Sequence, residues 1–190
     1  MRLLILFLLL VSFNSISQVL KKKGRSYGIG VQAFEPSGLT FQSFRGFFND
    51  NNSSLATYGV WELGVGKENI WGIAKGKPYQ GGNWVKGGVR VDLNYLHPVL
   101  TLYKPFVFQT YVGVGLQTGS RRYSTSSGEQ SNFATGANLM VRVEYVAHGF
   151  DFGRAVWFFS IYADIKYHVD FTESFDYVSP VVGMRLRRGR

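Results

Sequence analysis

The most regular pattern in the chain is an alternation of apolar and polar residues over positions 157–171, which read WFFSIYADIKYHVDF. Every odd-numbered position in this stretch is apolar or aromatic, whereas the even-numbered positions from Ser160 to Asp170 are polar or charged, apart from the amphipathic Tyr162. Side chains in a strand point to opposite faces with period two. The stretch therefore predicts a long strand with one apolar face and one polar face.

The rest of the chain shows the same period and no helical one. Clusters of Gly, Asn, Ser and Pro separate segments of strand character. The eight predicted strands are residues 26–34, 39–46, 56–67, 88–99, 106–118, 137–147, 156–171 and 177–188. Because an even number of strands lets an up-and-down sheet close with both termini at one end, we predict an all-β fold, a closed eight-stranded antiparallel barrel.

The position of glycine indicates which face lies inside the barrel. The glycines concerned all fall on the polar face: Gly28, Gly30, Gly64, Gly66, Gly113, Gly115 and Gly183. On an outer surface a strand glycine weakens the sheet, whereas inside a narrow barrel it leaves room for large neighbours. The polar face is therefore expected to point inward and the apolar face outward, toward lipid.

Aromatic residues near the strand ends agree with a transmembrane barrel. Tyr95 and Tyr145 lie close to strand ends, and Trp157 and Phe171 bracket the seventh strand, as interfacial aromatic girdles require. The alternative barrel is a soluble periplasmic lipocalin-like carrier, in which the apolar face would line a cup.

Charged residues on the polar face predict an ion-paired interior. Four acids and four bases lie away from the strand ends: Glu62, Arg90, Asp92, Arg142, Glu144, Asp164, Lys166 and Arg185. An equal count favours pairing over a pore lining of one sign. Hairpin registers predict Arg142 opposite Asp164, Asp164 near Arg185 and Glu62 near Arg90, with Asp164 at the centre. Tyrosines 58, 111 and 162 are expected to fill the remaining space and to leave a plug.

The connections differ in length between the two ends of the barrel. Those expected at the outer end are 35–38, 68–86, 119–136 and 172–176, and those at the inner end are 47–55, 100–105 and 148–155. Long polar outer loops with shorter inner turns are typical of outer-membrane barrels. Two of these loops carry basic residues that could meet lipopolysaccharide phosphates: Lys75, Lys77, Arg121 and Arg122.

The amino-terminal residues predict export. Arg2, an apolar run of nine residues and then the small residues Ser15 and Ser17 follow the order of a secretory signal peptide. We expect cleavage after residue 17, which leaves one domain over 18–190 located in the outer membrane. The chain has no Cys and a formal charge of +9. For an exported chain this basic charge indicates outer-membrane lipids as partners and no nucleic acid, and we expect a monomer.

Few residues suggest chemistry. His168 and Asp170 share the polar face, with Ser174 in the following loop, so a lipid-modifying enzyme using His168 is an alternative function. The other histidines, His97 and His148, lack metal-ligand spacing. The segment GVGKEN lacks the spacing of a phosphate-binding loop. We therefore assign no catalytic residue, no metal site and no cofactor.

The chain resembles the small eight-stranded outer-membrane β-barrel proteins of Bacteroidota. The resemblance rests on GIGVQAFEPSGLTFQSF, VDLNYLHP, KPFVFQTYVGVGLQTG and YVSPVVGMRLRR, which together extend over most of the chain. It implies an outer-membrane barrel with a structural or surface-interaction role through its outer loops. It implies no particular activity, because a fold does not fix a function.

Overall fold

The computed structural model describes residues 24–34, 36–49, 54–67, 78–79, 83–86, 88–102, 107–125, 127–147, 149–152, 155–172 and 176–189. The predicted signal peptide lies outside these ranges. Among the described residues, none forms a helix with the length and apolar content that a membrane span needs.

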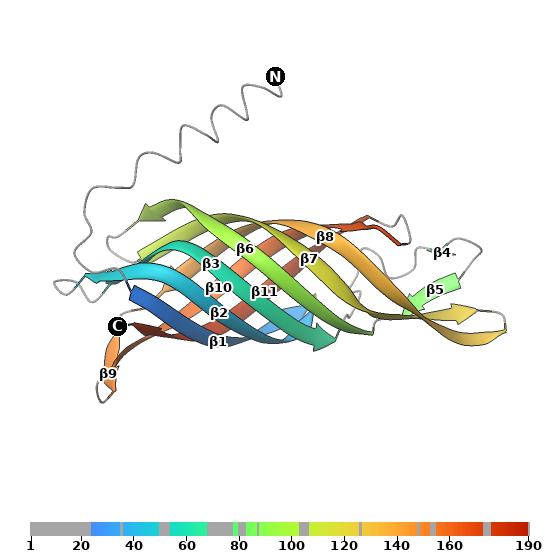
Figure 1. Ribbon diagram of the computed structural model, residues 1–190, viewed down its shortest axis with the longest axis horizontal. Coiled ribbons are helices and arrows are strands. Elements are labelled where there is room, and N and C mark those ends of the chain that lie inside the picture. The colour runs from blue at the N-terminus through green and yellow to red at the C-terminus, as the bar shows by residue number, and fades with distance from the viewer. Residues whose placement is uncertain are drawn as a thin grey trace, which may run out of the picture.

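Eight long strands form a closed antiparallel barrel (Figure 1). They are β1 (Gly24–Phe34), β2 (Ser37–Asn49), β3 (Ser54–Lys67), β6 (Val89–Leu102), β7 (Val107–Thr125), β8 (Gly128–Val146), β10 (Ala155–Asp170) and β11 (Tyr177–Gly189). Each strand pairs with the next along the chain, and β1 also pairs with β11, from Tyr27 opposite Arg188 to Phe34 opposite Val181. The predicted closed eight-stranded barrel is thus confirmed.

The two ends of the barrel differ. We call the end at which β1 starts and β11 finishes the near end, and the opposite end the far end. Three short strands lie outside the barrel: β4 (Pro78–Tyr79) and β5 (Asn83–Lys86) at the far end, and β9 (Phe150–Phe152), which pairs with the start of β10 at the near end (Figure 1).

The β7–β8 hairpin continues well beyond the barrel wall at the far end (Figure 1). The two strands pair without interruption from Val107 opposite Val146 to Thr125 opposite Gly128. The prediction of a loop over 119–136 is therefore wrong. This segment is rich in Ser, Thr, Asn and Gln and has no apolar face, so the period-two signal that reveals a half-buried strand is missing.

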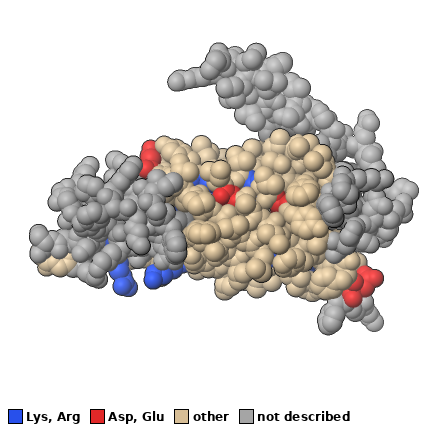
Figure 2. Space-filling model, turned by 180° about the vertical axis from the view of Figure 1, so that it is seen from behind, with Lys and Arg blue, Asp and Glu red and all other residues tan. Residues whose placement is uncertain are grey.

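The faces of the wall are divided as the alternation predicts. On β10 the side chains of Ile161, Ile165 and Tyr167 are exposed, whereas those of Asp164 and Lys166 are buried. The other long strands show the same division. In Figure 2 the middle of the wall consists mainly of uncharged residues, with small patches of charged atoms visible between them. Polar and charged groups lie inside, and the apolar side chains face outward.

An apolar cluster fills the near end of the interior, which sequence analysis did not predict. Inward-facing side chains from six strands form it: Phe44, Val60, Leu96, Val107, Tyr111, Met140, Val146 and Phe158. Each strand contributes only one or two of these residues at its near end, so no single segment shows an apolar inner face. The interior is therefore layered, apolar at the near end and polar beyond it.

Glycines on the inner face make room for large side chains at some positions only. A Cβ added to Gly183 would lie 2.3 Å from Cζ of Tyr162, and one added to Gly115 would lie 2.0 Å from Oδ1 of Asn94. A Cβ on Gly64 would meet nothing closer than 3.7 Å, at Cβ of Asp92. The expectation that inner glycines admit large neighbours thus holds for Gly183 and Gly115 and not for Gly64.

This difference predicts unequal effects of two matched substitutions. Gly183→Ala must displace the Tyr162 ring, and overpacking of this kind lowers the free energy of unfolding by about 1–3 kcal/mol. Gly64→Ala has space and is expected to be neutral or to stabilise by a few tenths of a kcal/mol, roughly the gain from a less flexible unfolded chain. Urea unfolding of the purified barrel in detergent measures both. Equal loss in the two variants would contradict the packing.

Candidate functional site

The interior charges form the most distinctive side-chain constellation in the molecule. The structure places all eight predicted interior residues inside the barrel, and each is buried: Glu62, Arg90, Asp92, Arg142, Glu144, Asp164, Lys166 and Arg185. Three further charged side chains, those of Arg121, Asp170 and Arg187, are buried with them. We describe this set from the far end to the near end.

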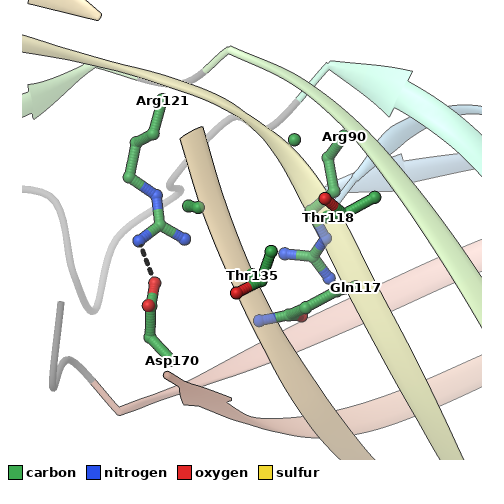
Figure 3. Close-up of a pocket in the computed structure, with 8 residues that line it drawn as sticks. Arg90, Gln117, Thr118, Arg121, Thr135 and Asp170 are labelled. Atoms are coloured by element: carbon green, nitrogen blue, oxygen red, sulfur yellow. Dashed lines mark hydrogen bonds and ion pairs between the residues drawn. The ribbon is translucent and has the colours of Figure 1, made fainter. Parts of the chain in front are cut away.

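Arg121 and Asp170 form an ion pair at the far mouth of the barrel, where Figure 3 shows the guanidinium reaching the carboxylate. The second carboxylate oxygen of Asp170 accepts hydrogen bonds from the backbone N–H and the hydroxyl of Thr172. A cavity of about 10 Å³ lies beside the pair, between Arg90, Gln117 and the two paired residues. A space of about this volume holds a single water molecule. The interpretation of Arg121 as a loop charge is wrong, because β7 continues through it and turns its side chain inward.

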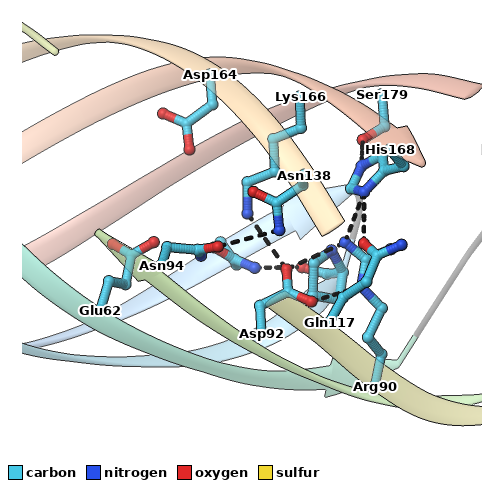
Figure 4. Close-up of polar contacts among 12 residues, drawn as sticks. Glu62, Arg90, Asp92, Asn94, Gln117, Asn138, Asp164, Lys166, His168 and Ser179 are labelled. Atoms are coloured by element: carbon cyan, nitrogen blue, oxygen red, sulfur yellow. Dashed lines mark hydrogen bonds and ion pairs between the residues drawn. The ribbon is translucent and has the colours of Figure 1, made fainter. Parts of the chain in front are cut away.

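Arg90 and Asp92 form the next layer (Figure 4). The guanidinium of Arg90 makes a two-pronged contact to Asp92, with Nε to Oδ1 at 2.6 Å and Nη2 to Oδ2 at 3.0 Å. Lys166 approaches the same carboxylate at 3.5 Å, and Arg90 also donates to the hydroxyl of Tyr177 at 2.6 Å. Both residues on β6 are thereby tied to β10 and β11 across the interior.

His168 lies directly beside this layer. Its Nε2 is 2.7 Å from Oγ of Ser179, and its Nδ1 is 2.7 Å from Oε1 of Gln117 and 3.2 Å from Nη2 of Arg90 (Figure 4). The ring stacks on Tyr177 with centroids 4.3 Å apart. With the proton on Nδ1 donated to Gln117, Nε2 accepts a hydrogen bond from the Ser179 hydroxyl.

This hydrogen-bond order is that of a base beside a hydroxyl nucleophile, yet its location does not suit lipid chemistry. His168 is 0% exposed and points into the barrel, away from the apolar wall. The predicted partner Asp170 instead contacts Arg121 and Thr172, and Ser174 lies outside the described residues. The arrangement fixes the side chain of His168 and offers no space for a lipid substrate.

Arg142 and Glu62 form the centre of the interior. Arg142 donates to both oxygens of Glu62 at 2.7 and 2.9 Å and to both oxygens of Asp164 at 2.6 Å each. Glu62 also accepts from Gln42 at 2.7 Å and lies 3.2 Å from Nη1 of Arg185. Two-pronged charged contacts of this kind are among the strongest polar interactions in proteins.

The ring of Tyr162 packs against two of these cations. The guanidinium carbon of Arg142 lies 4.3 Å from the ring centroid and that of Arg185 lies 3.6 Å from it. Such cation–π contacts are stronger when water is excluded. Tyr162 thereby contacts both arginines that share the Glu62 carboxylate, and its hydroxyl donates to Gln32 at 3.2 Å.

Glu144 organises the last charged layer above the apolar cluster. It accepts from Arg187 at 2.5 Å and from the Ser160 hydroxyl at 2.5 Å, and Nε of Arg185 lies 3.7 Å away. Arg187 was not among the interior charges that we predicted from the sequence. Arg187 lies two positions after Arg185 on β11, so the two side chains point to the same face. This spacing was the signal that could have placed Arg187 inside the barrel.

Of the three ion pairs predicted from the hairpin registers, one forms. Arg142 is directly opposite Asp164, as expected. The Asp164–Arg185 pair does not form, because Asp164 is opposite Val181 while Arg185 is opposite Ser160. Glu62 is opposite Asn94 rather than near Arg90, which is opposite Gly66. Among the charged residues of the described chain, Asp164 consequently contacts Arg142 alone. The central place that we predicted for Asp164 is taken by Glu62, which contacts both Arg142 and Arg185.

The remaining predicted residues are placed as follows. Arg122 is exposed on the outer face of β7, and Lys75 and Lys77 lie outside the described residues. Within the described ranges, no group of three or more His, Asp or Glu side chains is arranged to hold a metal ion.

Comparison with known proteins gives two structures of similar fold. The N-terminal β-barrel domain of Pseudomonas aeruginosa OprF is 14% identical, with a TM-score of 0.44 over 88% of this chain and 98% of that domain. Neisserial surface protein A (NspA) is 9% identical, with a TM-score of 0.38 over 90% of this chain and 100% of that protein. No protein-family model matches the chain, and no curated protein matches it. The likeness concerns the barrel fold.

The central contacts predict which carboxylate matters more for stability. Glu62→Gln removes the negative charge that two arginines share, so we expect the free energy of unfolding to fall by about 3–5 kcal/mol, the usual loss when a buried pair is broken. Asp164→Asn leaves Arg142 paired with Glu62 and should cost about 1–3 kcal/mol. Both substitutions keep the side-chain shape, and urea unfolding in detergent compares them. A larger loss for Asp164→Asn would contradict the assignment of Glu62 as the centre.

Proposed function

We propose that the chain is an integral outer-membrane barrel protein with a plugged interior, which acts through its far-end surface. The observation that carries this proposal is the absence of exposed charge from the middle of the described wall. Exposed charged side chains among the described residues occur only at the two ends: Asp151 and Arg188 near one end, and Lys67, Arg122 and Asp176 near the other.

The height of this uncharged band suits a bilayer. On β10 the outward side chains are apolar from Trp157 to Tyr167, which is ten residue steps along the strand. At about 3.3 Å per residue and a tilt of about 40°, ten steps rise roughly 25 Å along the barrel axis. The apolar band of outer-membrane barrels is about 25 Å tall.

A soluble carrier with an apolar cup would need the opposite arrangement of faces. In this chain the inner face carries the ion pairs and the outer face carries large exposed side chains such as Trp61 and Leu139. In water a continuous apolar surface of this kind would associate. Closure of the barrel also pairs the backbone groups of every wall strand, which a bilayer requires.

The interior supports a structural or surface-interaction role rather than transport. The apolar cluster closes the near end, and the layers from Glu144 to Arg121 fill the space above it. We infer that outer-membrane lipids surround the wall of a monomer, and that Lys67 and Arg122 at the far rim are placed to meet lipopolysaccharide phosphates. The same proposal includes export by the predicted signal peptide and membership of the small outer-membrane barrel proteins of Bacteroidota.

A pair of valine substitutions tests the membrane position of the wall. Val141 lies in the middle of the wall and is 51% exposed, and Val89 lies at the far rim, opposite Lys67, and is 62% exposed. In a bilayer Val141→Arg should lower the free energy of unfolding from lipid vesicles by about 2–4 kcal/mol and Val89→Arg by about 0–1 kcal/mol. If both arginines are tolerated equally and the wild-type protein stays monodisperse without detergent, the membrane proposal is wrong.

The plugged interior predicts a silent protein in electrical recordings. A folded membrane barrel migrates faster on a gel before boiling than after it, and this shift identifies folded protein. The folded protein should give no discrete conductance steps in planar bilayers. An open porin from the same preparation protocol serves as the positive control. Regular, ion-selective steps from the folded form would overturn the plug and leave the membrane location intact.

A further inference from the structure

The part of β8 beyond the barrel has one edge that no described strand covers. β8 pairs with β7 out to Gly128 opposite Thr125, but its pairing with β10 ends at Gly136 opposite Asp170. On the side of β8 that faces β10, residues 129–134 therefore have no described strand beside them. Figure 1 shows this hairpin extending past the end of β10.

The backbone groups on this edge can be assigned from the last contacts with β10. The carbonyl of Thr135 accepts from the N–H of Phe171 at 2.9 Å, and the N–H of Thr135 donates to Oγ1 of Thr172 at 3.3 Å. Successive residues in a strand direct their backbone groups to alternate sides. Since the register with β7 continues without a bulge, the N–H and C=O groups of Phe133 and Ser131 point to the open side.

Within the described part of the chain, the edge shows few of the features that usually prevent strand addition. Proteins protect edges with lysine, proline, bulges or covering segments. Residues 128–134 read GEQSNFA, with neither lysine nor proline. The side chains of Ser131, Asn132 and Phe133 are all exposed, and Phe133 is 67% exposed on the same face as the apolar wall.

We propose that this edge binds an extended segment of another protein by β-strand addition, antiparallel to β8 and in line with β10. The proposal rests on the proposed function, which places the far end outside the cell. The opposite edge of the same hairpin already carries an added strand, because β5 pairs with β7 from Trp84 opposite Ser124 to Lys86 opposite Arg122. The hairpin is therefore a two-stranded platform that accepts a short strand on one side.

The same edge of a second copy in the same membrane does not fit here. Two copies in one membrane must be related by an axis along the membrane normal. Edge-to-edge pairing of identical strands needs an axis perpendicular to the strands for antiparallel pairing, or parallel to them for parallel pairing. Barrel strands are tilted by about 40° and satisfy neither condition. Pairing of this edge with the same edge of a second copy is thereby excluded, and the occupant that we propose is a strand from a different protein.

The side chains beside the edge indicate the sequence that fits. In antiparallel pairing, the residue opposite Phe133 shares its face, so an apolar or β-branched side chain there packs against the ring. Arg122 is exposed on that face opposite Ser131, which favours an acidic residue in the segment two positions along. The partner segment therefore alternates apolar and polar residues and carries an acidic side chain.

The test uses a synthetic eight-residue peptide, labelled with a fluorophore, in which valine alternates with threonine and one outward position is glutamate. Binding to the full chain in detergent micelles is measured by fluorescence anisotropy, and protection of the Ser131 and Phe133 amides by NMR hydrogen exchange. We expect the peptide to protect both amides. A peptide N-methylated on its valines loses the donors that face β8 and should bind at least tenfold more weakly, whereas one methylated on its threonines should bind as well as the parent.

The matched protein variants are Ser131→Pro and Ser131→Ala. Proline removes an N–H that points away from β7, so the hairpin stays paired while the edge loses a donor. Alanine removes the hydroxyl that contacts Ser120 at 2.9 Å and keeps the N–H. Peptide binding should fall at least tenfold with proline and change less than twofold with alanine.

Three results would overturn the inference. They are equal binding by the proline and alanine variants, equal binding by the two methylated peptides, and amides of Ser131 and Phe133 that are already protected without peptide. The boiling-dependent gel shift of each sample is recorded in parallel. A folded barrel that fails to bind the peptide refutes strand addition alone, whereas loss of the gel shift in the wild-type chain refutes the proposed membrane function.

Discussion

The structure depends on the requirement that every charge turned into the closed barrel find a partner there. Six cations and five carboxylates are buried inside the described barrel: Arg90, Arg121, Arg142, Lys166, Arg185 and Arg187, with Glu62, Asp92, Glu144, Asp164 and Asp170. A buried pair contributes little net stability, but a buried charge without its partner is strongly destabilising. The ion pairs therefore act mainly by excluding other arrangements. A slip of one residue in any strand would turn its charges toward the apolar side.

The central contacts also join strands that are not neighbours in the sheet. Glu62 on β3 is held by Arg142 on β8 and by Arg185 on β11, and Arg90 on β6 reaches Tyr177 on β11. Backbone hydrogen bonds connect each strand only to the two beside it. The side-chain contacts across the interior thus fix the shape of the barrel's cross-section. The backbone hydrogen bonds between neighbouring strands alone would allow this shape to vary.

The sequence predicts the fold because its main signal is local. Alternation along a segment such as β10 shows a strand and its two faces, and a short turn relates Arg142 to Asp164 by simple counting. The contact between Glu62 and Arg142 depends on how far the sheet is sheared on closure, which no hairpin register contains. The outer part of the β7–β8 hairpin was missed for a different reason: both of its faces meet water, so it has no apolar period. The apolar cluster was missed because each strand contributes only one or two of its residues, as β6 contributes Leu96 and β10 contributes Phe158.

The division between the two faces bears on how such a chain diverges over evolution. In the membrane location that we propose, one apolar residue of the wall can replace another, because fluid hydrocarbon does not distinguish Val141 from Leu or Ile. An inner residue such as Arg142, in contrast, is constrained by partners on other strands, here Glu62 on β3 and Asp164 on β10. Descendants of a common ancestor would then retain every second position within a strand and drift at the others, and whole-chain identity would fall quickly while the architecture persists.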